Sequence, residues 1–289
     1  VVDVLHVRVQ VHLWEGPGLA FQLPLHLLEV VVVDVAISAG PDEVADAEAR
    51  LARWAEATER GAGAPAAEAI AELRRRLADD LDRVAAVRDV MGPGARIRVD
   101  ANGGWSLAQA ADALAGLAPF GLEYAEQPCA DVHDLARLRV ELARRGVDVP
   151  VAADESIRKA EDPLEVARLE AADVVVVKVA PLGGVAHALE VVADCGLPAV
   201  VSSAIDSSVG LRAGVALAAA LPDLGHACGL GTGALLAADV SREPLLPAEG
   251  ALPVREVVVD PDLLARHAAP PARVDWWRER VRAASAART

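Results

Sequence analysis

Short apolar runs alternate with helix-like segments from residue 95 onward, and this period of about 25 residues limits the fold more than any other feature. The runs are ARIRVD, LEYAEQP, VPVAADES, DVVVVKVAPLGG, LPAVVSSAIDSS and LGHACGLGT. Repeated strand–loop–helix units predict parallel strands joined by right-handed crossovers, which is an α/β fold. The chain is 53% hydrophobic but only 3% aromatic, so Val, Ala and Leu must fill the core.

The first third of the chain is less regular. VVVVDVAISAGP, ending at Pro41, predicts a strand, and DEVADAEARLARWAEATERG predicts the helix after it. A Gly/Ala/Pro linker then leads into roughly 25 helix-like residues without a convincing strand. We expect a short capping region at 1–30, a barrel over 31–255, and a C-terminal segment at 256–289 that packs on the cap or the barrel.

The formal charge of −15 at pH 7 argues against a nucleic acid or an anionic membrane as partner, because both would repel the chain. Small-molecule substrates and cations are the expected partners, and a homo-oligomer is left open. Three cysteines without CxxC spacing favour neither a disulfide framework nor a zinc site, which fits a reducing cytoplasm. No long uncharged apolar run or signal-peptide pattern was found in the sequence.

Polar residues stand where the predicted strands end. Successive separations are 26, 28, 24 and 24 residues along the series Asp100, Glu126, Asp154, Lys178 and Ser202. One βα unit therefore separates each pair of neighbours. The C-terminal ends of parallel strands in a closed barrel surround one pocket, so three carboxylates and a lysine are expected to converge there.

Three carboxylates suit a hard divalent cation such as Mg²⁺, which prefers oxygen ligands. Asp100 lies in VDANGGW, Glu126 in EQP and Asp154 in ADES, each at or just beyond an apolar run. Each acid taken singly could instead cap the following helix, the role that Ser106 is expected to play in GWSLAQ.

Lys178 ends a run of four valines, although the chain contains only one other lysine, Lys159. Such a lysine is costly to bury unless it is paired or takes part in chemistry. It can act as an acid or base, or face developing negative charge as a cation. The alternative is a snorkelling or ion-paired side chain. Asp173, at the other end of the same strand, is expected to be structural.

In this order and spacing, VDANGGW, EQPC, ADES, VVKVAPLGG and VSSAIDSSVGL resemble the enolase superfamily, specifically its o-succinylbenzoate synthases of the actinobacterial type. The resemblance covers roughly residues 85 to 255. It implies a (β/α)₇β TIM-like barrel with an α+β capping domain. The cap of this chain is shorter than the family usually shows, which leaves its completeness open.

The resemblance also implies roles for single residues. Asp100, Glu126 and Asp154 would be the Mg²⁺ ligands, and Lys178 would stabilise an enediolate as a cation. Substrate-binding roles are implied for Ser202, Ser203, Ser207, Gly229, Gly231 and Thr232, and a supporting role beside the metal for Asn102. The implied reaction is dehydration of the cyclohexadiene carboxylate SHCHC to o-succinylbenzoate, a step toward menaquinone.

One part of the family pattern is missing. The family's catalytic base is a lysine of a KxK motif some thirty residues before Asp100, whereas this chain has no lysine before Lys159. Arginines in that region are poor replacements because guanidinium stays protonated. Besides the lyase, the sequence leaves open an N-acylamino acid racemase or dipeptide epimerase, and a catalytically impaired protein that binds metal and a carboxylate.

Overall fold

A parallel sheet of seven strands forms the centre of the computed structural model, which describes residues 4–5, 10–12, 32–36, 80–158, 162–248 and 250–286. The strand order is β2-β3-β4-β5-β6-β7-β8, and each neighbouring pair is parallel. The strands are β2 (Gln10–His12), β3 (Val32–Ala36), β4 (Arg96–Asp100), β5 (Leu122–Glu126), β6 (Val151–Ala153), β7 (Val174–Lys178) and β8 (Ala199–Ser202). This arrangement confirms the predicted α/β class.

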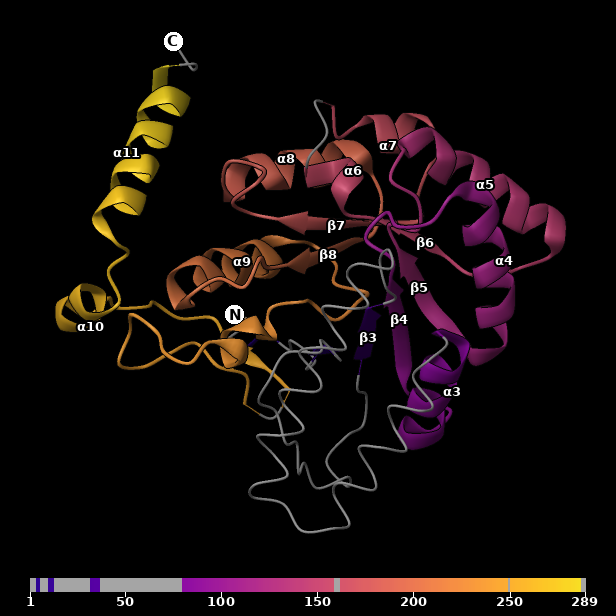
Figure 1. The fold of residues 1–289 in the computed structure, drawn as a ribbon, viewed down its shortest axis with the longest axis horizontal. Coiled ribbons are helices and arrows are strands. Elements are labelled where there is room, and N and C mark those ends of the chain that lie inside the picture. Colours follow the sequence, from indigo (N-terminus) through magenta and orange to yellow (C-terminus); the bar gives the residue numbers. More distant parts are fainter. Residues whose placement is uncertain are drawn as a thin grey trace.

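Helices between the strands pack on the outer face of the sheet (Figure 1). The longer ones are α3 (Asp80–Met91), α4 (Leu107–Leu117), α5 (Val132–Arg145), α8 (Val185–Cys195) and α9 (Ser208–Ala220). The short ones are η2 (Ala118–Phe120), α6 (Glu155–Arg158), α7 (Glu165–Arg168) and η3 (Gly231–Leu235). Each connection from β4 to β8 is thus a crossover through helix, as parallel pairing requires.

The strands bury both faces, and β7 shows how. Val175 and Val177 belong to the large core between the sheet and the helices. Val174 and Val176 point to the opposite face, where they pack with residues of three other strands: Tyr124, Ala152 and Val200. Successive side chains of a strand alternate between faces, so this second cluster marks the inside of the barrel.

Helix α4 begins as the sequence predicts. Ser106 is its N-cap: its hydroxyl accepts a hydrogen bond from the backbone N–H of Gln109, whose side-chain oxygen in turn accepts one from the N–H of Ser106 at 3.0 Å. This reciprocal capping box satisfies two N–H groups that a helix start leaves without partners.

Two predicted elements turn out shorter. The helix predicted over DPLEVARLEAA is only α7, because Glu170 takes a left-handed backbone with φ of 51° and ends it. The last predicted strand, LGHACGLGT, forms a single parallel bridge between Ser202 and Gly229 rather than a strand. β8 ends at Ser202, and the chain turns into η3 at Gly231, so only one position pairs.

A small second sheet joins the first described residues to a segment that follows the parallel sheet. β1 (Val4–Leu5) pairs antiparallel with β9 (Leu252–Pro253), while β2 adds to the edge of the parallel sheet. Two helices follow, α10 (Pro261–Arg266) and α11 (Pro271–Ala286), and α11 projects away from the sheet (Figure 1). Most of the predicted cap at 1–30 lies outside the described residues, so the division at 30 and 255 stays a prediction. Within the described ranges, no helix is long and apolar enough to span a membrane.

Candidate active site

Polar side chains end the strands β4, β5, β7 and β8 on the inner face of the barrel. Lys178 shares its face of β7 with Val174 and Val176 of the inner cluster, because the three are spaced by two. The same spacing relates Glu126 to Tyr124. Register pairs Asp100 with Glu126 on β4 and β5, and Lys178 with Ser202 on β7 and β8. Through β6, Glu126 is in register with Val174, which lies on the same strand as Lys178 and four residues before it. The backbone thus brings these strand ends together in pairs, while the convergence of all of them on one pocket stays a prediction.

Asp154 directly follows β6 and is the most enclosed of the predicted site carboxylates, with 2% of the residue exposed. Its Oδ2 accepts a hydrogen bond from Lys178 Nζ at 2.5 Å, and its Oδ1 accepts one from Arg158 Nε at 2.9 Å. Lys178 of β7 is thus in direct contact with Asp154, the third predicted metal ligand. This ion pair explains how a lysine can stand at the end of a run of four valines, because a buried charge requires a partner.

Arg158 is a site residue that sequence reasoning missed. It lies in α6, one turn after Asp154, and also forms an ion pair with Glu155. Burial by itself would lower the pKa of Arg158, but the carboxylates of Asp154, Glu155 and Asp100 outweigh burial and raise it. The guanidinium therefore lies in the field of two predicted metal ligands. The sequence did contain a signal for this contact: Asp154 and Arg158 are four residues apart, and side chains at that spacing in a helix lie next to each other.

Gln127 is the second residue that sequence reasoning missed, although it lies in the quoted EQP motif. It is fully buried with a left-handed backbone, φ 37°. Its side-chain oxygen accepts hydrogen bonds from the N–H groups of Asp154 and Ser156, at 3.0 and 3.3 Å, and its nitrogen donates to Ser156 Oγ and the Cys129 carbonyl. This side chain fixes the start of α6 against the end of β5, and so sets the position of Asp154.

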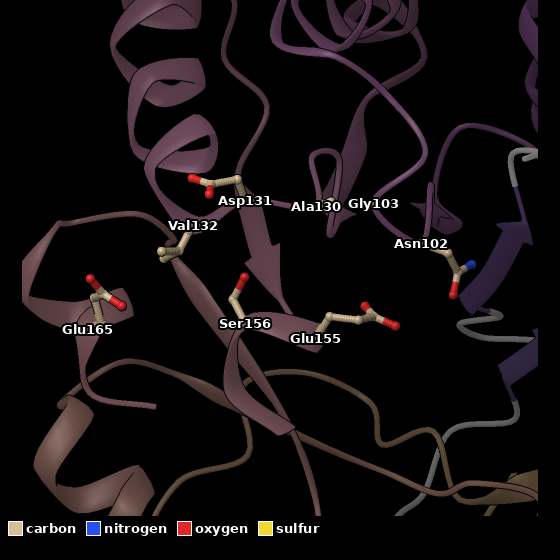
Figure 2. Close-up of a pocket in the computed structure, with 8 residues that line it drawn as sticks. All are labelled: Asn102, Gly103, Ala130, Asp131, Val132, Glu155, Ser156 and Glu165. Atoms are coloured by element: carbon tan, nitrogen blue, oxygen red, sulfur yellow. The ribbon is translucent and has the colours of Figure 1, made fainter. Parts of the chain in front are cut away.

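The loop after β4 carries Asn102 beside the first predicted metal ligand. The N–H of Asn102 donates to Asp100 Oδ1 at 2.8 Å, which holds that carboxylate over its own loop. Asn102 also lines a pocket of about 420 Å³ with Gly103, Ala130, Asp131, Val132, Glu155, Ser156 and Glu165. In Figure 2, Glu155 and Asn102 lie on one side of this pocket, with Asp131 and Glu165 on the other. The pocket is thus lined by the segments that follow β4, β5 and β6.

A smaller cavity of about 70 Å³ lies around Lys178 and is lined also by Ser202, Ser203 and Asp206. Ser203 Oγ donates to the Gly229 carbonyl at 3.0 Å and lies 2.6 Å from Thr232 Oγ1. Three predicted substrate-binding residues, Ser203, Gly229 and Thr232, are thus joined to one another beside the lysine.

Two further predicted substrate contacts lie at helix starts. Ser207 is the N-cap residue of α9, and Gly231 begins η3; neither lines the 420 or the 70 Å³ cavity of the described structure. Ser208, the next residue, is used structurally: its hydroxyl donates to Asp239 and accepts from the N–H of Leu245. Asp173, predicted to be structural, accepts a hydrogen bond from the N–H of Val151 and pairs with Arg139, which ties β6 to α5.

The carboxylates fit a hard divalent cation by their chemistry. They offer only oxygen atoms, and they follow three neighbouring strands of the sheet. As the side chains stand, no three His, Cys, Asp or Glu residues of the described part of the chain are grouped to hold a metal ion. Both oxygens of Asp154 are in ion pairs, so a cation would have to exchange for at least one of them. Lys159 and the region expected to hold KxK, before residue 80, lie outside the described residues.

The family is shown by comparison with known proteins. Residues 47–258 match the sequence model of the enolase C-terminal domain-like family. The o-succinylbenzoate synthase of Mycobacterium leprae is 56% identical over 214 residues, which are 74% of this chain and 61% of that protein. That of Thermobifida fusca is 56% identical over 218 residues, 75% of this chain and 66% of that protein. The chain belongs to the enolase C-terminal domain-like family, which confirms the predicted superfamily.

Solved structures agree on the fold. Muconate lactonizing enzyme from Pseudomonas putida superposes with a TM-score of 0.63 at 24% identity, over 84% of this chain and 59% of that one. The Klebsiella pneumoniae enzyme of the same name has a TM-score of 0.63 at 23% identity. These likenesses support the TIM-like barrel alone. The chain spans about six tenths of the length of the first curated relatives it matches.

Proposed function

We propose that this chain acts as an o-succinylbenzoate synthase-like lyase that depends on Mg²⁺ and dehydrates SHCHC in menaquinone biosynthesis. The observation that carries the proposal is the contact of Asp154 with Lys178 on the inner face, beside the in-register pair of Asp100 and Glu126. The 56% identity to synthases of this name supports the choice of reaction.

Asp100, Glu126 and Asp154 would hold the cation. When bound, it would neutralise the charge that develops on the substrate carboxylate as the neighbouring C–H loses its proton. Lys178 Nζ would face that negative charge from the β7 side, in a cavity that it already lines with Ser202 and Ser203. Ser203, held by Gly229 and Thr232, would place its hydroxyl for the substrate.

A second candidate is a protein that binds a divalent cation and a carboxylate without turnover. The feature that favours it is the lysine content: Lys178 is the one lysine in the described part of the chain, and the sequence holds only Lys159 besides. Racemisation requires proton transfer on both faces of the substrate, so the missing KxK weighs against the racemase or epimerase more heavily than against dehydration.

The proposal is tested by incubating the purified chain with SHCHC and Mg²⁺ and following product formation. Wild type is expected to turn over, Lys178→Ala and Asp154→Asn to lose at least about 10²-fold in rate, and Asp223→Asn, an exposed carboxylate outside the site, to match wild type. Wild-type rates no higher than those of Lys178→Ala, with Mg²⁺ binding intact, would reject the lyase and support the second candidate.

A further inference from the structure

Asp154 is held by two positive charges at once. Its side chain is 3% exposed, and each of its oxygens accepts from a different cation, Oδ2 from Lys178 and Oδ1 from Arg158. A divalent cation that uses this carboxylate would therefore arrive beside two like charges. At least one of the two must give way for a carboxylate oxygen to become a ligand.

The formal charges around Asp154 have both signs. Among the described residues, four carboxylates, Asp100, Glu126, Asp154 and Glu155, and two cations, Lys178 and Arg158, belong to this part of the barrel. Binding of a divalent cation to Asp154 would change the contacts among these charges.

Arg158 has a second carboxylate to move to, because it forms an ion pair with Glu155 three residues earlier in α6. Glu155 lines the 420 Å³ pocket and lies toward Asn102 (Figure 2). Arg158 is also less enclosed than Asp154, with 22% of its side chain accessible against 3%. A guanidinium keeps its charge in either position.

We propose that Arg158 is a positioning residue: an internal counter-ion that competes with the divalent cation for Asp154 and thereby sets the metal affinity of the site, withdrawing onto Glu155 at the pocket when the cation binds. This inference rests on the metal site of the proposed function. In the metal-loaded protein, the withdrawn guanidinium lies at the pocket wall, where it suits an anionic group of a substrate.

The test is calorimetric titration of the full chain with Mg²⁺ alone, so that the readout is binding rather than activity. Arg158→Gln removes the competing charge and is expected to lower the Kd at least tenfold. Arg158→Lys keeps the charge and is expected to stay within about threefold of wild type. Unchanged or weaker binding by Arg158→Gln would overturn the inference.

Glu155→Gln provides an independent arm with the opposite sign. It removes the alternative partner of Arg158, so the guanidinium should stay on Asp154 and the Kd should rise at least threefold. Tighter binding by this variant would contradict the inference even if Arg158→Gln failed to fold. Asp154→Asn separates the two proposals. If it binds like wild type, the metal site itself is wrong; if it loses binding while Arg158→Gln shows no tightening, only the role of Arg158 fails.

Discussion

At the scale of single residues, Glu123 shows how the barrel manages buried charge away from the site. Its carboxylate, 8% exposed, accepts from Arg98 Nε at 2.7 Å and from Arg96 at 2.9 Å, and lies 2.9 Å from His226 Nδ1. Burial by itself would raise the pKa of Glu123, but the hydrogen bond with His226 and the charge of Arg98 lower it to about 2. Glu123 therefore joins β4, β5 and the segment after α9.

The low pKa of Glu123 predicts a pH-dependent contribution to stability. Because the folded pKa of about 2 lies below the ordinary 4.5, the contribution is complete above pH 4.5 and is lost as pH falls toward 2. Glu123→Gln is expected to lower the free energy of unfolding by about 3 kcal/mol at pH 7. Urea denaturation should show the same difference in unfolding free energy from wild type at pH 7 and at pH 5, and a smaller difference at pH 3. Glu279→Gln, at an exposed position, serves as control; a gap that does not change with pH would contradict the assignment.

At the scale of elements, the start of α4 illustrates what local sequence decides. The Ser106–Gln109 capping box forms between residues three apart, so the sequence alone predicts it. The four buried residues of the helix, Ala110, Ala111, Leu114 and Leu117, recur at helical spacing and turn toward the core. The capping box and the spacing of the buried residues therefore predict the same helix. α4 lies in the crossover that joins β4 to β5.

Removal of this cap gives an element-scale prediction. Ser106→Ala is expected to lower the free energy of unfolding by about 1 kcal/mol, because the N–H of Gln109 loses the hydroxyl that accepts its hydrogen bond. Ser106→Thr retains the hydroxyl and should stay within a few tenths of a kcal/mol of wild type. Urea denaturation of both variants measures the difference, and equal stability of Ser106→Ala and wild type would show that solvent replaces the cap.

At the scale of the whole molecule, the barrel couples metal binding to folding. The predicted ligands come from β4, β5 and the turn after β6, so they are close only when these strands are paired. A cation that binds this folded arrangement and not the unfolded chain must stabilise the fold. The stabilisation depends on Asp154, which holds the site together through Lys178 and Arg158.

A melting experiment tests this coupling. Mg²⁺ at a hundredfold its Kd should stabilise the protein by about 2.7 kcal/mol and raise the Tm by roughly 5–10 °C. Asp154→Asn should melt without a Mg²⁺-dependent shift, whereas Asp223→Asn should shift like wild type. Differential scanning calorimetry with and without EDTA measures both. Equal shifts in Asp154→Asn and wild type would indicate cation binding elsewhere on this acidic chain.

Periodicity in the sequence determined the α/β class, the order of the strands and the residues at their ends. Both strand alternation and βα spacing are local rules, so Asp100, Glu126, Asp154 and Lys178 could be found by counting. The ends of two elements were not predicted. The left-handed backbone of Glu170 ends α7 early, and the last predicted strand pairs with β8 only at Gly229, because β8 ends at Ser202 and η3 begins at Gly231.

Only the tertiary structure decided which polar and charged side chains contact one another. Gln127 bonds across 27 residues to the N–H of Asp154, and Lys178 reaches Asp154 across 24. Arg158 could be seen as a neighbour of Asp154 in sequence, but its role as a competing cation depends on Lys178 holding the other oxygen. Charge in a buried site is balanced in three dimensions, because electrostatic energy depends on distance and burial rather than on position along the chain.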